Sequence, residues 1–162
     1  MGRAWKFGDD ISTDLIAAGR YAYLRTNLPE LAKHVLEDAR DEFRTGVKPG
    51  DFVVGGRNFG LGSSREHAPI IIKMAGVSCV AAKTFARIFF RNCINNGIPA
   101  VTVDTDRIDE GDELVLDLRG GLLKDVTKGI ELEFPPMPKV MSDILEAGGL
   151  VPYLKKNKGF VL

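Results

Sequence analysis

The stretch from residue 51 to residue 103 alternates short apolar segments with helical segments, and this order restricts the possible folds more than any other feature. The pattern predicts strands at 51–56, 77–82 and 98–103, and helices at 68–76 and 84–97. Thr84 is a suitable N-cap for the second helix, and Gly97 is a suitable stop. Strands joined by helices at this spacing pair in parallel through right-handed crossovers, so we expect an α/β fold with a mainly parallel central sheet flanked by helices.

The remaining segments extend this sheet at both ends of the chain. A helix is predicted at 27–43, because Pro29 suits a first helical turn and Leu31, Leu36 and Phe43 belong to an approximate apolar stripe. The other expected elements are a strand at 3–7, additional C-terminal strands at 113–118 and 130–134 joined by 119–129, and helical pieces at 138–149 and 150–156. With 162 residues and no internal repeat, residues 1–162 should form a single domain.

The charge balance argues against two classes of partner. Lys plus Arg equals Asp plus Glu at 22 each, so no net field attracts nucleic acid or an anionic membrane. The N-terminus has no apolar signal segment, and no apolar run is long enough to span a membrane. We therefore expect a cytoplasmic protein that binds neither nucleic acid nor membrane.

The glycine-rich loop "GGRNFGLGSSREHAP" (55–69) carries most of the chemically useful side chains. A nucleotide-triphosphate loop needs a lysine where Ser63 follows Gly62, and a dinucleotide fingerprint that starts at Gly60 ends in Arg65 instead of glycine. Both nucleotide patterns therefore fail. What remains is a loop whose N–H groups and helix start favour an anion, with Arg65 able to clamp a carboxylate and a serine able to act as a base.

A purely structural interpretation of the same loop is a capping box, since Ser63 and Glu66 have the required spacing. Pro69 conflicts with a helix that begins at Ser63, because the missing N–H would fall beyond the first turn. A separate turn at 63–66, followed by a helix that begins near His67, resolves this conflict.

Three segments together resemble a known family. "GRNFGLGSSREHAP", "KTFARIFFRN", and "DDISTD" followed by "AAGRYAYLRT" are similar to the swivelling domain of the aconitase superfamily, in its free-standing form as the small subunit of an isopropylmalate isomerase or homoaconitase. The likeness covers nearly the whole chain in the family's order. It implies a swivelling β/β/α domain and one subunit of an iron–sulfur hydro-lyase. Such an enzyme isomerises a 2-hydroxy di- or tricarboxylic acid by dehydration and rehydration through a cis-alkene, in amino-acid biosynthesis such as that of leucine.

The resemblance also implies a partner. In two-subunit members the large subunit holds a [4Fe-4S] cluster and the small subunit closes over it, as a heterodimer or heterotetramer that is active only when both are present. Cys79 and Cys93 match no metal-ligand spacing, and two isolated cysteines cannot supply three thiolates to a cluster. We therefore expect no metal or cofactor on this chain, and two buried thiols.

The resemblance assigns roles to individual residues. Ser63 matches the residue that removes and returns the proton, Arg65 an arginine that grips a substrate carboxylate, and Ser64 a neighbour that holds serine or substrate oxygens. Asp14 matches an acidic residue that pairs with an arginine. The expected supporting residues are Tyr23, Leu24, Thr26, Asn58, Gly62 and His67.

Arg25 lies in "YLRT", where the family carries its substrate-recognition loop. A polar version of this loop is associated in the family with an extra carboxylate, as in homoaconitate, and an apolar version with an isopropyl group. A guanidinium binds a distal carboxylate favourably, so Arg25 favours a substrate with an extra carboxylate. The segment between Gly19 and Tyr23 is longer than the family pattern, which leaves the direction of Arg25 open.

Several alternatives stay open on sequence alone. His67 could act as an acid or base, or could bond the backbone beside the site. Arg87 and Arg91 could face the site or the partner subunit, or could form salt bridges within the fold. For the whole chain, the alternatives are a phosphate- or nucleotide-binding α/β module and a non-catalytic interaction or RNA-binding domain, to which a net charge of zero gives little support.

Overall fold

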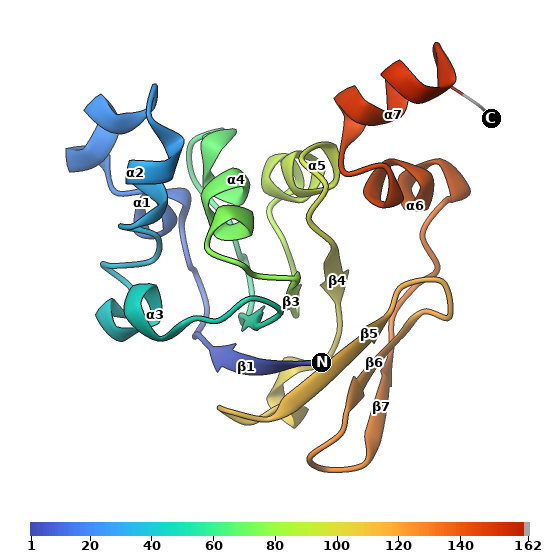
Figure 1. The fold of residues 1–162 in the computed structure, drawn as a ribbon. Coiled ribbons are helices and arrows are strands. Elements are labelled where there is room, and N and C mark those ends of the chain that lie inside the picture. Colours follow the sequence, from blue (N-terminus) through green and yellow to red (C-terminus); the bar gives the residue numbers. More distant parts are fainter. Residues whose placement is uncertain (161–162) are drawn as a thin grey trace.

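A computed structural model describes residues 1–160, which contain one seven-stranded sheet in the order β4-β3-β2-β1-β5-β6-β7 (Figure 1). The strands are β1 (Gly2–Lys6), β2 (Phe52–Val54), β3 (Cys79–Ala82), β4 (Ala100–Thr102), β5 (Glu113–Asp117), β6 (Leu122–Asp125) and β7 (Ile130–Glu133). The strands β1, β2, β3 and β4 form parallel pairs. The strands β5, β6 and β7 pair antiparallel and join the sheet at the other edge of β1. The predicted α/β class and the parallel strands of residues 51–103 are confirmed.

The helices gather on one side of the parallel strands, as Figure 1 shows. They are α1 (Thr13–Ile16), the 3-10 helix η1 (Gly19–Leu24), α2 (Leu28–Ala32), α3 (Asp41–Gly46), α4 (His67–Met74), α5 (Arg87–Asn95), α6 (Lys139–Glu146) and α7 (Leu150–Asn157). The short 3-10 helix η2 (Thr105–Arg107) follows β4. Val53 and Val80 point to this side, where they pack against Ile72 of α4 and Phe89 of α5. A second, smaller cluster joins α5 to α6 and α7 through Ile94, Ile144 and Tyr153.

The opposite face of the parallel strands packs against the antiparallel strands. Phe52 and Val54 alternate with Val53 along β2, and they share a core with Leu114, Leu123 and Leu132 of β5, β6 and β7. The sheet therefore curls so that its antiparallel half covers its parallel half. The result is the β/β/α layering that the resemblance implied, with the helices on one face only.

The helix predicted at 27–43 is wrong in its middle. α2 ends at Ala32 and α3 begins only at Asp41, and Leu36 between them has φ of 54°, outside the helical region. The backbone N–H of Leu36 donates to the carbonyl of Ile16 at 3.0 Å, and its side chain is fully buried. The apolar side chains of this segment are therefore buried in the core as predicted. Tertiary contacts, however, interrupt the predicted helix.

Two smaller predictions also need correction. Residues 119–129 are not only a connection, because Leu122–Asp125 form β6 and pair with both β5 and β7. Thr84 does not cap α5, which begins at Arg87; its hydroxyl oxygen instead accepts the backbone N–H of Asn58 at 2.8 Å. Among the described residues, no helix combines the length and the apolar character needed to cross a membrane.

Candidate active site

The glycine-rich loop leaves the carboxyl end of β2 and is attached to two other segments. On one side, Gly60 N–H donates to the carbonyl of Ile11 at 2.7 Å, and Thr13 N–H donates to that of Leu61 at 2.8 Å. On the other side, Phe59 accepts the N–H of Ala86 at 3.0 Å, just before α5. The loop therefore lies between the starts of α1 and α5, at the carboxyl ends of parallel strands, where open α/β sheets bind ligands.

Ser63 is held through its backbone and leaves its hydroxyl exposed. Its carbonyl accepts hydrogen bonds from the Thr13 hydroxyl at 2.9 Å and from the Arg65 N–H at 2.8 Å. The Thr13 and Ser63 hydroxyl oxygens are 3.5 Å apart. Gly62 precedes Ser63 with φ of 105°, a conformation that glycine adopts without strain.

Thr13 is the contact that sequence reasoning missed, although it lies in the quoted "DDISTD" beside the predicted Asp14. The predicted start of this helix near His67 is confirmed, since α4 begins at that residue. The alternative capping box does not form: in residues 1–160, no hydrogen bond joins Ser63 to Glu66.

Arg65 is held in one direction by two acceptors. Its Nη1 donates to Asp14 Oδ1 at 2.8 Å and to the carbonyl of Ala17 at 2.5 Å, and its side chain is mostly buried. The same Asp14 oxygen accepts the backbone N–H of Gly19 at 3.2 Å. Asp14 thus pairs with the arginine of the loop, and one carboxylate connects this arginine to the start of η1.

A pocket of about 380 Å³ brings the loop together with α5. Ser63, Ser64 and Arg65 line one side, and Arg87, Arg91 and Asn92 line the other. Within residues 1–160, neither Arg87 nor Arg91 forms an ion pair, so salt bridging is not observed in this part of the fold. Two uncompensated guanidinium groups therefore face the pocket and favour an anionic ligand.

The segment around Arg25 lies beside this pocket and does not line it. Arg25 is exposed directly after η1, with its N–H donating to the carbonyl of Ala22 at 3.2 Å. Leu24 is half-buried against the core, whereas Tyr23 is 74% exposed and Thr26 is exposed. None of these four predicted residues lines the pocket that contains Ser63, and among the four Leu24 packs against the core.

His67 begins α4 close to both predicted substrate arginines. Burial lowers the pKa of His67 below its usual value, and the positive charges of Arg25 and Arg65 lower it further. The lowered pKa favours the neutral imidazole at pH 7, and Arg25 and Arg65 both lie near enough to His67 for their charges to act on it.

Asn58 shapes the loop that carries Ser63. It has φ of 55°, which asparagine tolerates better than most residues, and its Nδ2 donates to Asp10 Oδ1 at 3.1 Å. Its backbone N–H is the group that Thr84 accepts. Asn58 therefore connects the loop to the segments on both sides and makes no contact with the pocket.

The described residues of this chain do not fit an iron–sulfur cluster. Cys79 and Cys93 are both fully buried in the core, and burial raises the pKa of each thiol well above its ordinary value. A cluster needs thiolates, which such thiols do not provide. No group of three or more His, Cys, Asp or Glu side chains suited to a metal occurs in residues 1–160.

Comparison with known proteins agrees with the motifs. Residues 17–106 match the family described as "Aconitase C-terminal domain". The chain is 62% identical to 3-isopropylmalate dehydratase small subunit 2 of Archaeoglobus fulgidus, over 97% of this chain and 95% of that protein. It is 51% identical to the isopropylmalate/citramalate isomerase small subunit of Methanocaldococcus jannaschii, over 96% of this chain and 94% of that protein.

A solved structure shares the fold as well as the sequence. The chain superposes on 3-isopropylmalate dehydratase from Methanocaldococcus jannaschii with a TM-score of 0.91 and 46% identity, covering 97% of this chain and 93% of that one. The resemblance stated from three sequence segments is therefore confirmed over nearly the full length. The chain belongs to the aconitase C-terminal domain family, among relatives that are small subunits of dehydratases and isomerases.

Proposed function

We propose that this chain is the small subunit of a two-subunit hydro-lyase that isomerises a substituted malate through a cis-alkene, with a large subunit that holds the [4Fe-4S] cluster. The protein would act in the cytoplasm, in a biosynthetic pathway such as that of leucine. The small-subunit names of the relatives support a large-subunit partner, and the buried thiols of Cys79 and Cys93 support a cluster held elsewhere.

This proposal rests on one observation: Ser63 lines the same pocket as three arginines, Arg65, Arg87 and Arg91. Arg65, directed by Asp14, is suited to grip one carboxylate of a dicarboxylic acid. Arg87 and Arg91 add positive charge that stabilises a second carboxylate and a serine alkoxide. In this arrangement Ser63 removes the proton from the carbon next to the carbinol and returns it to the neighbouring position, while Ser64 holds substrate oxygens.

The preferred substrate is a malate with a short apolar substituent. The names of relatives in Archaeoglobus fulgidus and Thermotoga maritima specify isopropylmalate, and that of the Methanocaldococcus jannaschii relative adds citramalate. Homoaconitate is the second candidate because Arg25 is exposed and forms no ion pair within residues 1–160, so it is available to a distal carboxylate.

Reconstitution with a cluster-bearing large subunit tests the proposal. The complex should turn over isopropylmalate, and Ser63→Ala should lower kcat by about 10²-fold to 10⁴-fold, the usual contribution of a general base. Ser142→Ala, on α6 and away from the pocket, is the matched control and should retain full activity. An inactive wild-type complex on both acids, or a Ser63→Ala complex with near-normal turnover, would contradict the proposed chemistry.

A further inference from the structure

The η1 turn is held only in part by the apolar core, against whose edge Tyr21 and Leu24 pack. None of its residues, Gly19–Leu24, is fully buried, and it is separated from α2 by only three residues. A short 3-10 helix has weak internal hydrogen bonding, so its conformation depends on what binds it from outside. Arg25 follows directly, which makes its direction a consequence of how the turn is held.

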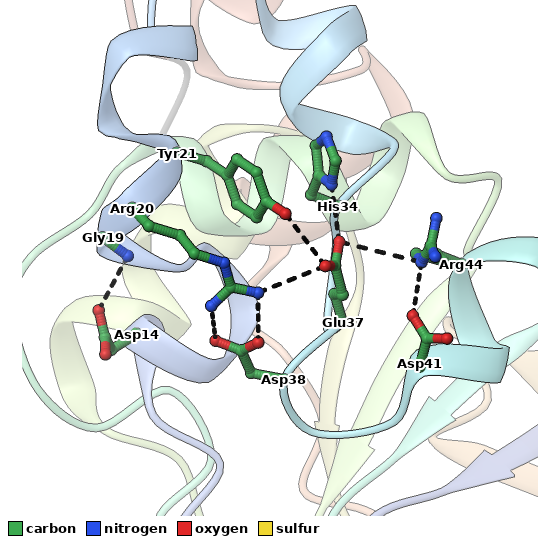
Figure 2. A network of polar contacts seen from close by, with 9 residues as sticks. All are labelled: Asp14, Gly19, Arg20, Tyr21, His34, Glu37, Asp38, Asp41 and Arg44. Atoms are coloured by element: carbon green, nitrogen blue, oxygen red, sulfur yellow. Dashed lines mark hydrogen bonds and ion pairs between the residues drawn. The ribbon is translucent and has the colours of Figure 1, made fainter.

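A cluster of charged and aromatic side chains binds the outer part of this turn, as Figure 2 shows. The Tyr21 hydroxyl donates to Glu37 Oε1 at 3.0 Å, and the Tyr21 ring stacks on His34 with centroids 3.9 Å apart. His34 Nδ1 lies 2.6 Å from Glu37 Oε2. Glu37 is therefore bound at both oxygens, and its side chain is only 18% exposed.

Arg20 adds a second connection to the same segment. Its guanidinium binds both oxygens of Asp38 at 2.6 Å and reaches Glu37 Oε1 at 3.3 Å. Two adjacent side chains of the turn thus bind two adjacent carboxylates between α2 and α3. A forked guanidinium–carboxylate pair restricts orientation more than a single contact does.

The inner end of the turn is bound to the site itself. Asp14 accepts the Gly19 N–H and the Arg65 guanidinium with the same oxygen, and Arg65 also donates to the carbonyl of Ala17. The conformation of residues 17–19 therefore affects the positions of Asp14 and the Ala17 carbonyl, the two acceptors that bind Arg65. Asp14 binds Gly19, and Glu37 with Asp38 binds Arg20 and Tyr21, so three consecutive residues shortly before Arg25 are fixed.

We propose that Glu37, together with Tyr21, Arg20 and His34, is a positioning cluster that fixes the Ala17–Arg25 segment and thereby directs Arg25 toward the substrate. The cluster lies outside the pocket and touches no reacting group. This inference rests on the proposed function for its effect on substrate, but the anchoring itself does not. It also gives a role to the extra residues between Gly19 and Tyr23, because Arg20 and Tyr21 are the residues that bind the carboxylates.

The anchoring can be measured without activity, by amide hydrogen exchange on the full chain. Glu37→Gln should accelerate exchange of residues 17–26 about fivefold or more, and Tyr21→Phe about twofold, because the first change weakens all the contacts of the carboxylate and the second removes one. Glu146→Gln is the matched control, since it makes the same change in a carboxylate that binds Arg119 at 2.7 Å, away from η1. Equal exchange of residues 17–26 in wild type and Glu37→Gln would overturn the proposal.

The effect on substrate is measured in the reconstituted complex. For Glu37→Gln we expect KM to rise about threefold to tenfold for an acid with a distal carboxylate, with kcat and isopropylmalate kinetics nearly unchanged. A purely structural role would instead lower kcat for both acids in proportion to the lost folded fraction, and this result would overturn the directing role. A wild-type complex inactive on both acids would refute the proposed function, while hydrogen exchange would still decide whether the cluster anchors the turn.

Discussion

Arg65 combines a charge, a fixed direction and a position beside Ser63, and lysine can reproduce only the first of these. Asp14 and the Ala17 carbonyl bind the guanidinium from one side, which leaves its remaining N–H groups for a ligand. We expect Arg65→Lys to lower kcat/KM by at least about tenfold, equivalent to ~1.4 kcal/mol, because an ammonium cannot bind Asp14 and a carboxylate in forked geometry together. Steady-state kinetics of the reconstituted complex checks this, with Arg57→Lys, outside the pocket, as the control.

Arg25 is the residue at which the two candidate substrates should separate. Arg25→Val should lower kcat/KM for homoaconitate. The expected loss corresponds to about 1.5 to 3 kcal/mol of transition-state stabilisation, the scale of a hydrogen bond to a charged group. Isopropylmalate turnover should stay equal or improve, since no cation then faces an apolar substituent. The measurement is kcat/KM for both acids with one enzyme preparation. Parallel losses on both acids would show that Arg25 supports the loop and does not read the substrate.

The residue types within one motif predicted much of the candidate site. Contacts between different motifs could be seen only in the folded structure. Ser63, Ser64 and Arg65 are adjacent in the chain, so the sequence placed them together, and the structure brings all three to one pocket. Thr13 was missed because its partner Ser63 is 50 residues away. The same reason applies to Glu37, which is apart from Tyr21 in sequence and gave no motif signal. The catalytic roles of these residues stay predictions.

At the scale of single elements, periodicity succeeded where an element packs along its whole length. α5 lies within its predicted range and α4 does so except for His67, because each presents a continuous apolar face to the parallel strands. The predicted helix at 27–43 failed because Leu36 bonds Ile16 of α1 instead of continuing the helix. A hydrogen bond to a backbone carbonyl far away in the sequence cannot be predicted from the local pattern of apolar residues.

The β6 strand contains a carboxyl group whose environment opposes its ionisation. Asp125 is buried, its Oδ1 accepts the Lys128 N–H at 3.0 Å, and its Oδ2 has no hydrogen-bond partner among the described residues. Burial raises the pKa of Asp125, and the neighbouring Asp112 carboxylate raises it further. A raised pKa in the folded state means that the ionised form favours unfolding, so this group lowers stability as pH rises above its unfolded pKa near 4.

Asp125→Asn should therefore stabilise the chain at neutral pH. The amide keeps an acceptor for Lys128, carries no charge, and offers a donor to Asp112. We expect Tm at pH 7 to rise by about 2–4 °C, the scale of ~1 kcal/mol in a domain of this size, and the gain to shrink as pH falls toward 4. Thermal unfolding of both proteins across this pH range checks the sign. A Tm at pH 7 below that of wild type would show that the carboxylate contributes stability.

At the scale of the whole molecule, the strand pattern predicted a parallel sheet flanked by helices, and the resemblance predicted β/β/α layers; the structure has helices on one face of the parallel strands only. β2 and β3 are continuous apolar runs, which suit a sheet covered on two sides. One cover is helical and the other is the antiparallel half of the same sheet. Periodicity cannot distinguish these two covers, because both bury apolar strand residues equally well.

The placement of both thiols inside this layered core leads to a prediction for the assembled enzyme. Cys79 and Cys93 lie on opposite faces of the parallel layer, in separate apolar clusters, so they cannot converge on one metal without unfolding. We expect the isolated chain to be inactive and to show no iron–sulfur absorbance, and activity to appear on titration with a cluster-bearing partner. Cys79→Ala and Cys93→Ala should each lower stability by about 1–2 kcal/mol, from the loss of one buried atom, yet leave the iron content per complex unchanged. Iron analysis of the purified complexes checks this, and a lower iron content in either variant would assign a ligand to this chain and refute a cluster held wholly by the partner.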